Sequence, residues 1–552
     1  MPLRGLFFLE FIMHRNKSVN QHQFAMIPRA DIPRAAFNRE TSHKTTINSG
    51  YLYPFFIDEV LPGDTFNFSA TVFGRLATPF VPFMDNLYAD TFFFFVPNRL
   101  VWTNWVKMNG EQDNPSDSIS YVTPQQVSPV TGYAPLSLQD YFGLPTVGQL
   151  DGAGTGVSHS ALPLRAYNLI WNQWFRDENL QNSVTVDKGD GPDTVSNYVL
   201  MRRGKRKDYF TSALPFAQKG AAVLLPLGTK APVKGITIST GTANAASAAV
   251  AYDSAGASIP VGQRVYTSAS MNILDNLNTV GSIGSGGHLP DIYADLSAAT
   301  SATVNQLRQS FQIQKLLERD ARGGTRYSEL LQAHFGVTPQ DYRLQRPEYL
   351  GGGSTPINVS PIAQTQATGA SGTTTPLGQL AAMGTLLARN GFSYSALEHG
   401  HIIGLVSVRA DINYQQGIRK LWTRSTRYDY YMPEFAMLGE QAVLLKELYA
   451  RGTSADLTAF GYQERWAEYR YFPSLITGQF KSTTASPLDI WHLAQKFTSA
   501  PTLNDTFIQD NPPVDRVVAV PSQPQFLLDV FMKIRTVRPM PMYSVPGLID
   551  HF

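Results

Sequence analysis

Two acidic residues in the second half of the chain have the spacing and aromatic neighbours that a glycosidase carboxylate pair could use. Glu464 and Glu468 lie in the segment GYQERWAEYR, which is rich in aromatic side chains. Glycoside hydrolases use two carboxyl groups, one as the acid and one as the base or nucleophile. Each acid has an arginine close by in sequence, and interleaved opposite charges are also typical of ion-pair networks at interfaces. We therefore expect Arg465, Glu468 and Arg470 to lie in a subunit interface, with a β-sandwich glycoside hydrolase using Glu464 and Glu468 as the alternative.

A second candidate site is the histidine pair His399 and His401, which follows Glu398 in SALEHGHIIGL. Imidazole is a common metal ligand, and alternate residues of a strand point to the same face. No third ligand lies nearby, and polar residues at the start of a strand usually form hydrogen bonds, so we expect structural roles and no metal. The chain has no cysteine, which excludes disulfides, thiolate nucleophiles and Cys-based zinc sites.

The densest charge in the chain is the segment RRGKRK, with five cations in six residues. Phosphate is their natural counterpart, and the aromatic residues Tyr209 and Phe210 that follow could stack on bases. A solvated turn, or a cluster answered by acids of an adjacent subunit, explains the same pattern equally well. The candidate nucleic-acid contacts in this segment are Arg202, Arg203, Lys205, Arg206 and Lys207.

The composition favours a protein that buries surface against other copies. Of the 552 residues, 43% are hydrophobic and only 16% are charged, below the roughly 25% usual for soluble domains. A large oligomer interface accounts for such a surface. The net charge is +2, from 45 Lys and Arg against 43 Asp and Glu, so any nucleic-acid site must be local.

The elements predicted from residue periodicity are mainly strands. Aromatics make up 12% of the chain, which also has 43 Gly and 36 Pro. In residues 65–73 apolar and polar residues alternate, and residues 90–96 contain four consecutive phenylalanines suited to a strand buried on both faces. Further strands are predicted at residues 402–408, 514–520 and 526–535. Strands dispersed so widely require long insertions between them.

Two helices are predicted inside these insertions. Residues 164–175 carry an apolar stripe at helical spacing, formed by Leu164, Tyr167, Trp171 and Trp174. Residues 303–322 begin with a capping box, Thr303 and Gln306, and end before two glycines. This second helix has apolar residues on opposite sides, so we expect other layers or neighbouring subunits to cover both.

Three segments have no clear core pattern. We expect residues 1–44 to form an extended basic arm, with the natural start at Met13 and residues 1–12 as an upstream extension, and residues 45–552 to form the main domain. Residues 224–287 are rich in Ala, Ser, Thr and Gly and are predicted to form a surface projection, while residues 351–375 read as a linker. No apolar run reaches about 18 residues, so we expect no membrane insertion.

Several longer segments identify a family. They include MHRNKSVNQHQFAMIPRADIPR, LPGDTFNF, FFFFVPNRLVWTNW, LPLRAYNLIWNQWFRDENL, RGKRKDYFTSALP, EHGHIIGLVSVRADINYQQG, FGYQERWAEYRY and RPMPMYSVPGLIDHF. They are distributed along nearly the whole chain, from residue 13 to residue 552. In these segments the chain resembles the major capsid proteins of the gokushoviruses, the branch of the Microviridae that comprises small bacteriophages with circular single-stranded DNA.

The resemblance implies a mainly β fold, an eight-stranded antiparallel jelly roll with long inserted loops and a few helices. It implies a non-enzymatic protein of the virion that assembles in the bacterial cytoplasm into a T=1 icosahedral shell of 60 copies around single-stranded DNA. The implied partners are a small basic DNA-packaging protein, an internal scaffolding protein and a host receptor, with residues 224–287 clustered at the threefold axes. Inward DNA contacts from the arm would be Arg15, Lys17, Arg29 and Arg34.

Overall fold

The structure is a computed structural model that describes residues 33–223, 233–234, 293–294, 304–363, 365 and 380–543. Arg15, Lys17 and Arg29 lie outside the described residues. Of the predicted projection at residues 224–287, the structure describes only the two residues of strand β7 (Val233–Lys234), which pairs with β8 (Tyr293–Ala294).

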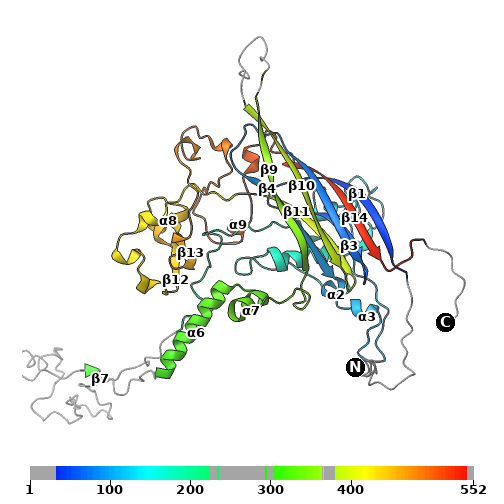
Figure 1. The fold of residues 1–552 in the computed structure, drawn as a ribbon, viewed down its shortest axis with the longest axis horizontal. Helices are drawn as coiled ribbons and strands as arrows, with labels where there is room; N and C mark the ends of the chain where they lie inside the picture. Colours follow the sequence, from blue (N-terminus) through cyan, green and yellow to red (C-terminus); the bar gives the residue numbers. More distant parts are fainter. Residues whose placement is uncertain are drawn as a thin grey trace, which may run out of the picture.

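Eight strands form one antiparallel sheet that is nearly closed (Figure 1). In the order in which they lie side by side, they are β1 (Ala35–Ile47), β14 (Phe526–Arg538), β3 (Thr65–Leu76), β10 (Leu380–Ser395), β9 (Glu348–Ala363), β4 (Leu87–Pro97), β11 (Gly400–Ala410) and β2 (Tyr53–Val60). Strands that neighbour in space come from distant parts of the sequence. This arrangement confirms the predicted jelly roll.

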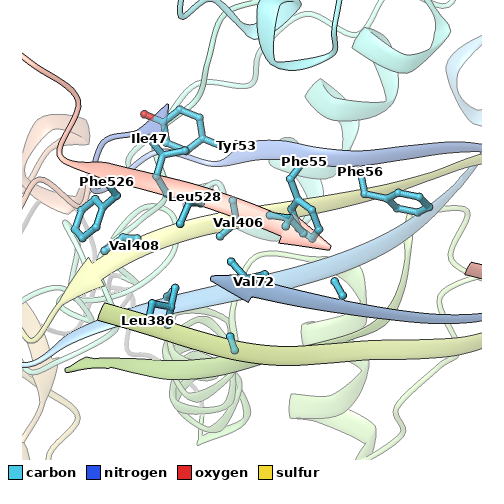
Figure 2. Packing of buried hydrophobic residues seen from close by; sticks show 14 of the residues in the cluster. Ile47, Tyr53, Phe55, Phe56, Val72, Leu386, Val406, Val408, Phe526 and Leu528 are labelled. Carbon is cyan, nitrogen blue, oxygen red and sulfur yellow. The ribbon is translucent and has the colours of Figure 1, made fainter. Parts of the chain in front are cut away.

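The strands make two layers of four, β1-β14-β3-β10 and β9-β4-β11-β2, with a common core between them (Figure 2). Phenylalanines join the layers directly. The ring of Phe68 on β3 lies 4.5 Å from that of Phe56 on β2 and 5.1 Å from that of Phe93 on β4. At the open seam, Arg39 on β1 pairs with Asp58 on β2 at 2.5 Å, so an ion pair links the two edge strands.

Most predicted strands are confirmed, and three predictions are wrong. The confirmed strands are β3, β4, β11 and β14. Residues 514–520 contain a short 3-10 helix, Val514–Arg516, and Val514, Val517 and Val518 are buried in the core. Residues 351–363 of the supposed linker belong to β9.

The arm prediction also extends too far, because residues 35–44 lie in β1 and pair with β14. The inward-facing positions of β1 include Arg39, Thr41 and His43. These polar residues remove the alternation of apolar side chains by which a half-buried strand is normally recognised.

The outer face of the second layer is covered by helices. They are α2 (Asn98–Val101), α3 (Trp105–Met108), α4 (Leu138–Tyr141) and α5 (Leu162–Ile170), which continues as a π-helix, Trp171–Phe175. Phe94 faces this helical cover, whereas Phe93 and Phe95 face the core between the layers. The run of phenylalanines is therefore buried on both sides, as predicted.

A buried ion pair fixes α5 to the loop that follows it. Arg165 and Asp193 are 0% and 1% exposed and 2.5 Å apart. Arg165 also donates to the carbonyl oxygens of Val101 at 3.1 Å and Gly189 at 2.8 Å, and the Tyr198 hydroxyl donates to Asp193. A guanidinium buried in this way is tolerated only because nearly all of its donors are used.

The remaining elements lie outside the sandwich. They are β5 (Gln125–Val127), β6 (Ser158–Ser160), α6 (Val304–Gly323), α7 (Tyr327–Phe335), β12 (Glu440–Leu444), α8 (Leu445–Leu448), β13 (Ala459–Glu464) and α9 (Asp505–Ile508). The predicted helix at residues 303–322 is confirmed as α6, which extends away from the strands (Figure 1). Phe311 on one side and Leu316 on the other are 62% and 50% exposed. None of the described helices is long and apolar enough to cross a membrane.

We expect Arg165→Met to destabilise the subunit by about 3–5 kcal/mol, because it leaves the Asp193 carboxylate buried without its partner. Urea unfolding of full-length subunits measures the change. Lys107→Met is the control, because Lys107 and Asp113, whose side chains are 33% and 75% exposed, form a solvent-accessible pair at 3.8 Å and such pairs contribute about 0–1 kcal/mol. Equal effects of the two substitutions would contradict the prediction.

Candidate nucleic-acid and assembly sites

The RRGKRK segment crosses between the helical cover of the sandwich and the unit built on β12 and β13. Its first two arginines are used inside the subunit. Arg202 donates to the carbonyl oxygen of Asp510 at 3.1 Å, and its guanidinium lies 4.0 Å from the centre of the Tyr51 ring. Arg203 donates to Asp90 on β4 at 2.6 Å. These two arginines therefore tie the segment to the sandwich.

Both lysines of the segment also interact with polar groups of the same subunit. Lys205 is buried, donates to Gln495 at 2.8 Å and lies 4.2 Å from the centre of the Phe507 ring. Burial lowers its pKa to about 8. Lys207 pairs with Asp177 at 2.5 Å.

The aromatic residues after the segment, Tyr209 and Phe210, are also internal. They are buried in a small core with residues of β12, α8 and α9, so they cannot stack on bases. Apart from Arg206, the cations of the RRGKRK segment thus have polar partners within the same chain.

Arg206 is the exception in this segment. It is exposed and forms no ion pair among the described residues. With Arg203 and Arg409 it lines a cavity of about 330 Å³ above Asp90. Asp90 also accepts a hydrogen bond from Arg409 at 2.9 Å, while Nη1 of Arg409 is buried without a hydrogen-bond partner. Because Nη1 of Arg409 also lies 3.6 Å from Asp411, three arginines face two carboxylates here, and Arg206 is the one left for a further anion, such as a phosphate.

The charge state of Asp90 follows from these neighbours. Burial opposes ionisation, but a hydrogen bond with Ser354 and the charge of Arg203 hold the pKa of Asp90 below its ordinary value. Arg409 was not identified from the sequence as part of this site. An arginine near the end of the apolar strand VSVRA does indicate a buried acidic partner, because a buried charge must be paired. Of the four arm residues predicted to contact DNA, the structure describes Arg34, which donates to Thr65 at 3.4 Å and to the carbonyl oxygen of Gly63.

The acids of the GYQERWAEYR segment are each paired. Glu464 lies 2.5 Å from Arg470 and 3.8 Å from Arg322. Glu468 lies 3.2 Å from Arg424 and accepts a hydrogen bond from Gln441 at 2.6 Å. With both carboxylates held by arginines, neither is placed to protonate a leaving group, which argues against the glycosidase alternative.

The predicted interface residues differ in accessibility. The side chain of Glu468 is only 8% exposed, whereas that of Arg470 is 63% exposed. Arg465 lies with its guanidinium 4.7 Å from the centre of the Trp466 ring and donates to the carbonyl oxygen of Tyr428. Arg470 is therefore the member of this group most available to a neighbouring subunit.

Large apolar side chains gather on the surface of residues 418–475. The exposed ones are Ile418, Leu421, Trp422, Tyr428, Tyr430, Tyr431, Met437, Leu438, Leu457, Tyr469, Phe472 and Leu475. Trp422, Met437 and Phe472 are 75%, 97% and 79% exposed. Exposed apolar patches of this kind mark interaction surfaces.

The histidine pair has structural surroundings. His399 lies edge-on to Trp105, with ring centres 5.5 Å apart. His401 is half-buried, its Nδ1 is buried without a hydrogen-bond partner, and desolvation lowers its pKa to about 4 against a weaker opposing effect of Asp58. Among the described residues, no group of three His, Asp or Glu side chains could hold a metal ion.

A two-layer jelly roll with broad apolar surfaces and paired carboxylates defines a structural protein of the viral-shell class. Comparison with known proteins agrees, and the chain belongs to the capsid protein (F protein) family, whose model matches residues 25–548. It is 46% identical to capsid protein VP1 of Bdellovibrio phage phiMH2K over 542 residues, which cover 97% of this chain and 99% of that protein.

Two further relatives carry the same name. Identity to capsid protein VP1 of Chlamydia phage 1 is 43% over 600 residues, covering 96% of this chain and 98% of the relative. Identity to capsid protein VP1 of Spiroplasma virus 4 is 35% over 551 residues, covering 96% and 97%. The chain is thus a structural, non-enzymatic capsid protein, and its place is the virion.

The lowered pKa of His401 predicts an acid-sensitive subunit. With its pKa lowered from 6.5 to about 4, its contribution is constant above about pH 6.5 and is lost as the pH falls toward 4, by about 3 kcal/mol in total. His401→Gln should remove this part of the pH dependence of urea unfolding. The same substitution at His399 is the control, and an unchanged pH profile in His401→Gln would contradict the prediction.

Proposed function

We propose that the protein assembles into a T=1 icosahedral shell of 60 identical copies that encloses circular single-stranded DNA. The observation that carries the proposal is the exposed apolar surface of α6 and of residues 418–475 on a chain with only 16% charged residues. Such a surface is stable in water only when neighbouring copies cover it. Family membership over nearly the whole chain supports the same function.

The DNA contacts in this proposal are sequence-independent, because a shell must accept every part of its genome. Arg15, Lys17 and Arg29 are the arm residues proposed to face the DNA, together with Arg206 at the rim of the arginine-lined cavity. Arg34, Arg202, Arg203, Lys205 and Lys207 have partners inside the subunit, so any part they take in DNA binding would require shared contacts.

Other partners follow from the proposed assembly. A small basic protein would neutralise the packaged DNA, and an internal scaffolding protein would guide assembly in the bacterial cytoplasm. Residues 224–287 are proposed to form projections at the threefold axes that meet the host receptor. Their low charge supports contacts between copies.

A reconstruction of particles from cells that produce the protein tests the proposal. We expect closed shells with 60 copies and nuclease-protected single-stranded DNA inside. Full-length protein that stays monomeric at high concentration under every ionic condition tried would overturn it.

The interface role of Arg465, Glu468 and Arg470 is tested separately with Arg470→Ala. Because the Arg470–Glu464 pair is exposed, its loss should change subunit stability by no more than about 1 kcal/mol. If Arg470 contacts a neighbour, the yield of particles falls while the unfolding midpoint of the subunit stays unchanged. Arg451→Ala, at another exposed arginine, is the matched control, and equal yields of both variants would contradict the assignment.

A further inference from the structure

The two layers of the sandwich differ on their outer sides. Helices cover the layer β9-β4-β11-β2, whereas in the described part of the chain most outward side chains of β1-β14-β3-β10 are exposed. These outward positions are every second residue of 36–46, 65–75, 385–393 and 527–537, and we call them the open sheet face. On this face Phe73 is 47% exposed, Leu387 70% and Phe531 40%.

The open sheet face is positively charged. Its five cations are Lys44, Arg75, Arg389, Lys533 and Arg535, and its two acids are Glu40 and Asp529. Both acids form ion pairs with the lysines, Lys44 with Asp529 at 3.3 Å and Lys533 with Glu40 at 3.8 Å. In the described part of the chain the three arginines make no ion pair with a carboxylate. Three guanidinium groups on one face are therefore available to an anion.

Strand register staggers these arginines along the strand direction. Arg75 is on β3, Arg389 on β10 lies opposite Thr71, and Arg535 on β14 lies opposite Asn67. Thr71 and Asn67 are four and eight residues from Arg75 along β3, so successive arginines are separated by roughly 14 Å along the strand direction.

Aromatic rings and small polar groups lie between the charges. Phe73 and Phe531 sit on neighbouring strands, at positions between Arg75 and Arg535, and Phe531 lies opposite Thr71. The other outward residues of β3 are Ser, Thr and Asn, whose side chains commonly donate hydrogen bonds to phosphate oxygens. The face therefore combines anion-binding groups, hydrogen-bond donors and flat apolar rings.

This combination fits one class of partner. Single-stranded nucleic acid presents regularly spaced phosphates and unpaired bases, and proteins bind it without sequence preference through cationic surfaces with aromatic stacking platforms. A second copy of this chain is a poorer fit, since the centres of protein interfaces are depleted of charge, whereas here Lys533, opposite Ser69 on the inner strands β14 and β3, is close to the middle of the face.

We propose that the open sheet face is a binding surface for the packaged single-stranded DNA, with Arg75, Arg389 and Arg535 holding phosphates and Phe73 and Phe531 stacking on bases. The inference rests on the proposed function as a container for single-stranded DNA. It places the main contact on the sandwich itself, away from the RRGKRK segment.

The test is a triple variant, Arg75→Gln, Arg389→Gln and Arg535→Gln, of the full-length protein. Binding of labelled oligo(dT) to the subunits is measured by fluorescence anisotropy over a range of salt concentrations. Loss of three phosphate contacts should lower the slope of log K against log salt by about 2. Arg343→Gln, Arg427→Gln and Arg451→Gln together are the control, since all three arginines are exposed and lie outside the face, and this variant should keep the wild-type slope.

A second variant tests stacking. Phe73→Leu with Phe531→Leu keeps the face apolar but removes the rings, and should weaken oligo(dT) binding by about tenfold or more with the salt slope unchanged. Loss of binding in this variant cannot come from a lost charge.

Three results would overturn the inference. They are an unchanged salt slope in the triple arginine variant, an equal loss in the control variant, and failure of folded triple-variant subunits to form particles, which would place the face between copies. Wild-type particles that contain no single-stranded DNA would instead refute the proposed function, so the two failures are distinguishable.

Discussion

The contact between the inner faces of two four-stranded layers is the constraint on which the rest of the molecule depends. Phe68, Phe56 and Phe93 meet across it, and residues from almost every part of the sequence enter the same core. Because the paired strands are far apart in sequence, the segments between them must leave the sandwich and return. These inserted segments form the helices, the small sheets and most of the exposed apolar surface.

Charge is distributed according to the same architecture. Inside the subunit, arginines pair with acids where the segments inserted between strands pack against the sandwich, as in Arg165 with Asp193 and Arg203 with Asp90. Among the described residues, the arginines of the open sheet face have no such partners. Whether a cation pairs with an acid of the same subunit or stays accessible to a ligand thus depends on whether a second element packs over its strand. The density of charge in the sequence does not show which of the two applies.

Self-assembly offers a physical reason for the low charge of the chain. A protein that functions as a monomer needs a mainly polar, hydrated surface, whereas α6 and residues 418–475 expose large apolar side chains to solvent. In a closed shell the same side chains would supply the favourable free energy of association, and a few arginines would set orientation.

The sequence by itself determined the β-rich class, strands β3, β4, β11 and β14, helices α5 and α6, and the family, because periodicity and motif spacing are local properties. It did not reveal β1, whose inward residues are polar, or the partners of RRGKRK, or the open sheet face. Those features arise when strands hundreds of residues apart are brought into register, as β1 and β14 are. Only the tertiary structure decides which cation meets an acid and which stays free for a ligand.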